Sequence, residues 1–88
     1  MALRTATDRL ADELRLRSVR LRKHVLHAIA GAGAGHTGGD LSCLDLLTVL
    51  YGGVLRVSPD TVDDPDRDRF VMSKGHSVEA LYVVLAER

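Results

Sequence analysis

Apolar side chains recur at helical spacing through the first third of the chain. Steps of three, four and seven residues separate the members of one stripe: Leu10, Leu14, Leu21, Val25, Ala28 and Ala32. Thr5 precedes this stripe, and Asp8 follows Thr5 at the spacing of a capping box. The pattern therefore predicts one long amphipathic helix over residues 6–31.

A second apolar face follows a glycine-rich segment and predicts a short helix over residues 43–52. This face consists of Cys43, Leu46, Leu47, Leu50 and Tyr51. Ser42 stands at the N-cap position, and Asp45 lies three residues further on, again at capping-box spacing. We expect Gly52 and Gly53 to end the helix, because glycine is the favoured residue after a helical C-terminus.

The last third of the chain combines a loop, a strand-like run and another helical pattern. Residues 56–69 contain both prolines and many Asp and Arg residues, which is typical of a surface loop. The run RFVMS at 69–73 favours a short buried strand of a parallel sheet. From Ser77 onward, a third helix is predicted from one apolar stripe: Val78, Leu81, Tyr82 and Leu85.

The predicted order is helix, glycine loop, helix, loop, strand and helix, so we assign the chain to the α/β class. A single parallel strand cannot form a sheet without neighbours. We therefore expect residues 1–88 to be one partial domain, incomplete as a free-standing sheet, with residues 1–20 as an N-terminal helical extension. The other strands would come from a partner chain or from further sequence.

Composition excludes several classes of partner. Lys and Arg number 12 and Asp and Glu number 12, so a net charge of zero gives no indication of nucleic-acid binding. No apolar run approaches the roughly 20 residues of a membrane span. The single cysteine, Cys43, cannot form an internal disulfide, and we predict that it is a small buried hydrophobe. These features predict a cytoplasmic protein.

The segment GAGAGHTGG at 31–39 holds the first candidate chemical group, His36. Residues 33–38 match the G-x-G-x-x-G pattern, but a dinucleotide site needs a strand before its glycines, and here a helix precedes them. A turn between helices needs only one or two glycines. We expect the additional glycines to let the backbone lie close against another group, with the His36 ring at the edge of a cavity.

The second candidate is the segment SKGH at 73–76, between the predicted strand and the third helix. Ligands gather at the carboxyl ends of strands, and helix N-termini stabilise anions. Gly75 permits a tight turn, Lys74 adds positive charge, and His76 can donate to a phosphate oxygen. An ordinary strand–helix turn is the alternative. No His, Cys or carboxylate set has metal-ligand spacing, so no metal site is predicted within the chain.

Together, these two segments resemble the start of the transketolase family. GHTGGDLS is similar to the family's Gly-His-Pro-Gly-Gly-Ser-Leu-Ser segment, and DRDRFVMSKGHSVEALYVVLAER is similar to its strand, turn and helix. The resemblance runs from about residue 21 to residue 88. It implies the beginning of a thiamin diphosphate-binding fold, namely the start of the diphosphate-binding (PP) domain.

The resemblance also implies an activity and roles for residues. It implies a thiamine diphosphate-dependent transferase that moves a two-carbon ketol unit from a ketose to an aldose. His36 would be catalytic and contact substrate beside the reacting carbons, and His76 would lie at the diphosphate and also contact substrate. Gly75 and Lys74 would bind the cofactor with His76. The Mg²⁺ ligands and the glutamate that activates the aminopyrimidine would come from partner chains or missing sequence.

Three interpretations remain open at this stage. The chain is one subunit of a split enzyme whose partners supply the rest of the PP domain and the pyrimidine-binding (Pyr) domain, a truncated fragment of such an enzyme, or a non-catalytic scaffold module. Three residues depart from the family pattern. Thr37 replaces proline, Asp40 replaces serine or proline, and Ser77 replaces alanine and offers an N-cap to the third helix.

Overall fold

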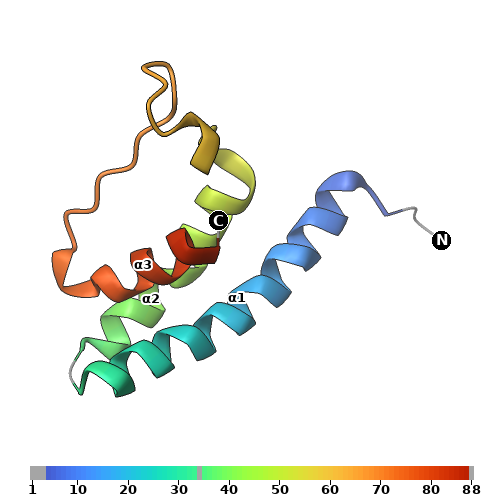
Figure 1. Ribbon diagram of the computed structural model, residues 1–88. Coiled ribbons are helices and arrows are strands. Elements are labelled where there is room, and N and C mark those ends of the chain that lie inside the picture. Colours follow the sequence, from blue (N-terminus) through green and yellow to red (C-terminus); the bar gives the residue numbers. More distant parts are fainter. Residues whose placement is uncertain (1–3, 34, 88) are drawn as a thin grey trace.

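The computed structural model describes residues 4–33 and 35–87. Its main elements are three α-helices, α1 (Ala6–Ala32), α2 (Thr37–Val49) and α3 (Val78–Glu87). In Figure 1, α2 lies along the C-terminal half of α1, and α3 packs over both helices. The N-terminal end of α1 projects away from this assembly.

Three short helical turns complete the described elements. A π-helical turn, η1 (Leu50–Val54), continues directly from α2. Two 3₁₀ turns follow, η2 (Pro59–Thr61) inside the long connection and η3 (Gly75–Ser77) immediately before α3. The connection between η2 and η3 runs along the outside of the helices as an irregular trace (Figure 1).

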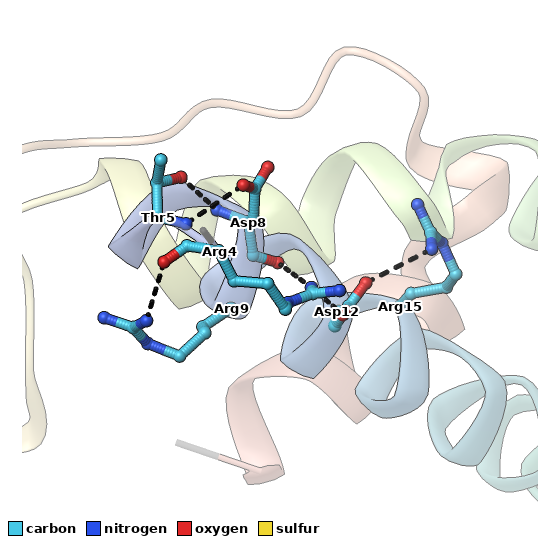
Figure 2. A network of polar contacts seen from close by, with 6 residues as sticks. All are labelled: Arg4, Thr5, Asp8, Arg9, Asp12 and Arg15. Atoms are coloured by element: carbon cyan, nitrogen blue, oxygen red, sulfur yellow. Dashed lines mark hydrogen bonds and ion pairs between the residues drawn. The ribbon is translucent and has the colours of Figure 1, made fainter. Parts of the chain in front are cut away.

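The predicted first helix and its cap are confirmed. Thr5 Oγ1 accepts a hydrogen bond of 3.0 Å from the Asp8 amide, and Asp8 Oδ2 accepts one of 3.1 Å from the Thr5 amide. Figure 2 shows this capping box beside ion pairs that join Arg4 and Arg15 to Asp12. At the other end, Gly33 has φ +73°, a left-handed conformation that glycine adopts without strain.

Removing the capping hydroxyl should loosen the start of α1. Thr5→Ala is expected to cost about 1 kcal/mol of helix stability and to speed hydrogen exchange at the Asp8 amide, whereas Thr5→Ser should preserve both. Hydrogen bonding from the Thr5 backbone, and secondarily from its side chain, lowers the pKa of Asp8. The cap is therefore complete above the ordinary Asp pKa and is lost as pH falls through the lowered value. Unchanged exchange in Thr5→Ala would contradict this account.

One small apolar cluster joins the three helices. Its fully buried members are Leu21, Val25, Leu44, Leu47, Ala80 and Val84. Cys43 is half-buried against this cluster, so its predicted role as a small core residue is confirmed in part.

The second helix begins earlier than predicted. It starts at Thr37, with His36 at the N-cap position, so the predicted N-cap role of Ser42 is wrong. Ser42 instead donates its hydroxyl to the carbonyl of Gly39 from inside the helix. A tertiary contact explains the difference, because the Asp40 carboxylate in the first turn accepts a hydrogen bond from the backbone of α3. That contact outweighs the low helix propensity of glycine.

The prediction that Gly52 and Gly53 end the second helix is also wrong. Both lie inside η1, and the chain leaves the helical path only at Leu55. Gly52 is needed for close packing, because a Cβ at this position would lie 2.4 Å from Leu14 Cδ2. The absence of a side chain lets η1 lie against α1.

The predicted strand at 69–73 is wrong, since no strand occurs in residues 4–33 and 35–87. Side chains in this segment nevertheless alternate as they would in a strand. Phe70 and Met72 pack against the core, and the Phe70 ring meets Tyr51 edge-on at 6.0 Å, whereas Val71 is 86% exposed. The backbone has no neighbouring strand with which to form a ladder, so the α/β character is not realised here.

Helix α3 was predicted correctly, but its buried face was not. Ala80 and Val84 are buried, whereas Tyr82 and Leu85 of the predicted stripe are exposed. The radius of gyration is 14.4 Å, against about 12 Å for a closed domain of this length. The described chain is therefore less compact than a closed domain, and it exposes large apolar side chains such as Leu16 and Val71.

Candidate functional site

The two histidines singled out in the sequence lie together. His36 is the N-cap residue of α2, and His76 lies in η3, directly before α3. Their ring centroids are 5.4 Å apart, and the rings meet edge-to-face at 71°. Both side chains are exposed, and the His36 ring makes no capping hydrogen bond. The fold thus brings two titratable, donor-capable rings from distant parts of the sequence to one surface.

The glycine surplus around His36 has specific uses. Gly35 lies close to α1, because a Cβ there would be 2.8 Å from Ile29 Cγ1. Gly39 lies close to η3, because a Cβ there would be 2.7 Å from Ser77 Oγ and 3.5 Å from His76 Cδ2. The prediction that these glycines permit a close approach is confirmed at both positions.

Lys74 connects the two histidine-bearing segments. Its ammonium group donates to the carbonyl of Gly39 over 2.9 Å and to Ser42 Oγ over 2.6 Å. These bonds hold η3 against the first turn of α2 and leave one of the three N–H donors for another group. Gly75 is exposed, with open space where a side chain would be.

Ser77 does not act as an N-cap, contrary to the sequence prediction. It is the last residue of η3, and its amide donates to the Lys74 carbonyl over 3.0 Å, so it already lies inside the helical path. Its side chain is fully buried, and its hydroxyl has no hydrogen-bond partner in the described chain. The hydroxyl instead fills the space that Gly39 leaves open.

Sequence reasoning missed a buried carboxyl group, Asp40, at the contact between α2 and α3. Asp40 is fully buried, and its Oδ1 accepts a 3.0 Å hydrogen bond from the Ala80 amide. Burial raises the pKa of Asp40, as do the nearby charge and carboxyl of Glu79, although the Ala80 amide and His36 act in the opposite direction. The sequence signal for the burial of Asp40 is its i, i+4, i+7 spacing with Leu44 and Leu47, which are also buried. This spacing indicates a shared buried face only if the helix starts at Thr37.

Two other classes of site have little support in the described residues. Among residues 4–33 and 35–87, no three His, Cys, Asp or Glu side chains gather where they could hold a metal ion. No helix in the same residues is long and apolar enough to cross a membrane.

Comparison with known proteins identifies the family. Residues 14–87 match the transketolase thiamine diphosphate-binding domain. The chain belongs to the transketolase family. The match covers both histidine segments and all three helices except the first part of α1.

Curated relatives show the same relationship. The chain is 55% identical over 74 residues to one of the subunits of the apulose-4-phosphate transketolase of Phocaeicola vulgatus, covering 84% of the chain and 26% of the relative. It is 44% identical over 66 residues to a 6-deoxy-6-sulfo-D-fructose transketolase subunit of Clostridium sp., covering 75% and 24%. It is 38% identical over 73 residues to transketolase of Sinorhizobium medicae, covering 83% and 10%.

The aligned part of the chain thus spans about a quarter of each of the two relatives named as subunits and a tenth of the longer transketolase. No solved structure matches the chain.

Proposed function

We propose that this chain is a component of a thiamine diphosphate-dependent transketolase-like enzyme that transfers a two-carbon ketol unit. The observation that carries the proposal is the contact between His36 and His76, since both lie in the part matched to the thiamine diphosphate-binding domain. When bound, the cofactor would supply the carbanion that attacks a ketose. This chain would supply groups that hold the diphosphate and move protons at the substrate.

The residues around η3 fit an anionic diphosphate. His76 is exposed and can donate a hydrogen bond, and Lys74 keeps one free donor and its positive charge. Gly75 leaves open space where a phosphate group needs close access to the backbone. We assign these residues to cofactor binding, and His76 also to substrate binding.

His36 fits general acid–base work at the reacting carbons. A neutral imidazole ring carries one donor and one acceptor nitrogen, so it can both accept and donate a proton during the reaction. The His36 ring is exposed beside His76, where it can reach a group bound at η3. We assign it to catalysis and to the binding of substrate hydroxyls.

The proposed enzyme needs more polypeptide than this chain. We expect the Mg²⁺ ligands, the remaining strands of the PP domain and the Pyr domain to come from partner subunits or further sequence. Relatives named as subunits support this arrangement. An apolar groove of about 600 Å³ runs between α1 and α2, lined in part by Leu10, Leu14, Val19 and Val49, and offers a surface for such contacts.

The isolated chain is expected to be partly folded or to associate, and to bind thiamine diphosphate only weakly. Light scattering with thermal unfolding measures the first property, and calorimetry with thiamine diphosphate and Mg²⁺ measures the second. A monomer with a cooperative melt would contradict the need for a partner.

The decisive test is co-purification with chains encoded nearby that carry a Gly-Asp-Gly segment and the Pyr domain. The complex should bind thiamine diphosphate with Mg²⁺ and transfer a two-carbon unit. Because one relative is named for apulose 4-phosphate, that ketose is the first donor to test. Cofactor binding without transfer from any ketose would favour the scaffold alternative, and a longer natural polypeptide would favour the fragment alternative.

A further inference from the structure

Asp40 and Glu79 lie at the contact between α2 and α3. Asp40 lies in the first turn of α2, and Glu79 lies in the first turn of α3. The Asp40 carboxylate already joins the two helices through the Ala80 amide. These first turns directly follow the segments that carry His36 and His76.

The remaining carboxyl oxygens of this pair have no ordinary donor. Asp40 Oδ2 and Glu79 Oε2 are both buried and lack a hydrogen-bond partner in the described residues. Asp40 Oδ1 is bonded to the amide of Ala80, the residue that follows Glu79, and Glu79 is one of the groups that raise the pKa of Asp40. Two ionised carboxylates cannot hydrogen-bond to each other, because both are acceptors. A proton on one of them makes it a donor to the other.

The charged groups around the pair do not replace that proton. Lys74 is bonded to Gly39 and Ser42 on α2. His36 at the start of α2 favours the ionised form of Asp40, but burial and the charge of Glu79 favour the protonated form more strongly. His76, in the turn before α3, contacts the His36 ring. The side chain of α1 that approaches this region is the apolar Ile29, which lies against Gly35, the residue before His36.

We propose that Asp40 and Glu79 share one proton, and that this carboxyl pair fixes the starts of α2 and α3 and thereby the contact between His36 and His76. Both residues are positioning residues, since they act through the histidines. The proposal concerns the protonation of the chain itself, so it does not depend on cofactor binding or on the proposed activity.

The pair makes the site sensitive to pH in a defined direction. Because the pKa of Asp40 is raised in the folded chain, the native state holds more protons than the unfolded state above the ordinary Asp pKa of 3.8. Stability from the pair is therefore complete below that value and is lost as pH rises through the raised pKa. Ionisation of both carboxyls should separate the starts of α2 and α3.

The test is an NMR titration of the carboxyl groups, with ¹³C-labelled Asp and Glu. It is carried out on the full chain together with any partner that co-purifies with it. We expect the two carboxyls to titrate in two steps separated by more than about 1 pH unit, the upper step lying above the ordinary range. In Asp40→Asn, whose amide replaces the shared proton as donor, the upper step should be lost. Asp45→Asn, an exposed carboxyl on the same helix, is the matched control and should leave both steps unchanged.

The positioning role of the carboxyl pair is measured through the contact between the His36 and His76 rings. Magnetisation transfer between the His36 and His76 rings should persist in Asp40→Asn and weaken in Asp40→Ala, which keeps neither donor nor acceptor. If Asp40→Ala does not fold, the titration of the unmodified chain decides alone. Both carboxyls titrating together in the ordinary range would overturn the proposal. An upper step that moves with MgCl₂ concentration would also overturn it, because a cation would then join the carboxyls.

Discussion

His36→Ala is expected to lower two-carbon transfer by about 10²- to 10⁴-fold while leaving thiamine diphosphate affinity unchanged. Loss of a positioned general acid–base group has an effect of this size. The His36 ring lies at the start of α2, free of capping bonds, whereas Lys74 and Gly75 directly precede His76. Turnover of the reconstituted complex and calorimetry with thiamine diphosphate and Mg²⁺ separate the two quantities.

For His76, the same measurements are expected to show a loss of cofactor affinity. His76→Ala should weaken diphosphate-dependent binding by about ten- to a hundred-fold, the range expected for one hydrogen bond to a charged group. Because the two rings touch, His36→Phe is the informative companion, since it keeps an edge-to-face partner but cannot transfer a proton. His24→Ala, an exposed histidine on α1, should change neither quantity. Equal losses of cofactor affinity in both site variants would refute the division of roles.

Gly39→Ala is expected to destabilise the folded chain by about 1–3 kcal/mol, the usual cost of overpacking. The new Cβ would lie 2.7 Å from the buried Ser77 Oγ and 3.5 Å from His76 Cδ2, so η3 must move away from α2. The matched control is Gly38→Ala, in the same turn but with no atom within 4 Å of its Cβ. It should stabilise the chain by about 0.5–1 kcal/mol, because alanine is the better helix former.

The urea midpoint of the helix signal, measured on the co-purified complex, reports both substitutions. Adding Ser77→Ala to Gly39→Ala should restore most of the lost stability, because it removes the hydroxyl that the new methyl group meets. Thiamine diphosphate affinity should fall in Gly39→Ala and recover in the double variant, since His76 moves with η3. Gly39→Ala and Gly38→Ala with the same midpoint would show that the close approach does not matter.

Local patterns predicted the elements that depend on local interactions. The first helix begins at its capping box and ends within one residue of the expected position, because apolar spacing and the Thr5–Asp8 pair are properties of neighbouring residues. The third helix was found for the same reason. The strand-like alternation of Phe70, Val71 and Met72 is also present, but a strand is defined by pairing with another segment.

The candidate site was only partly accessible from the sequence. His36 and His76 stood out because each lies in an unusual segment, one rich in glycine and one between a strand-like run and a helix. Asp40 looked like a departure from the family pattern, and no pattern singled out Glu79. Their burial depends on where α2 begins, which glycine propensity alone assigns incorrectly.

By itself, the sequence determined the helical periods, the cap of α1 and the two histidine segments, because each is encoded within a few neighbouring residues. The tertiary structure decided that Gly38 and Gly39 are helical, that Asp40 and Ser77 are buried, and that the two imidazole rings meet. Those outcomes depend on residues about forty positions apart lying side by side. Only the packing of α3 on α2 sets such distances, and with them the burial that raises the pKa of Asp40.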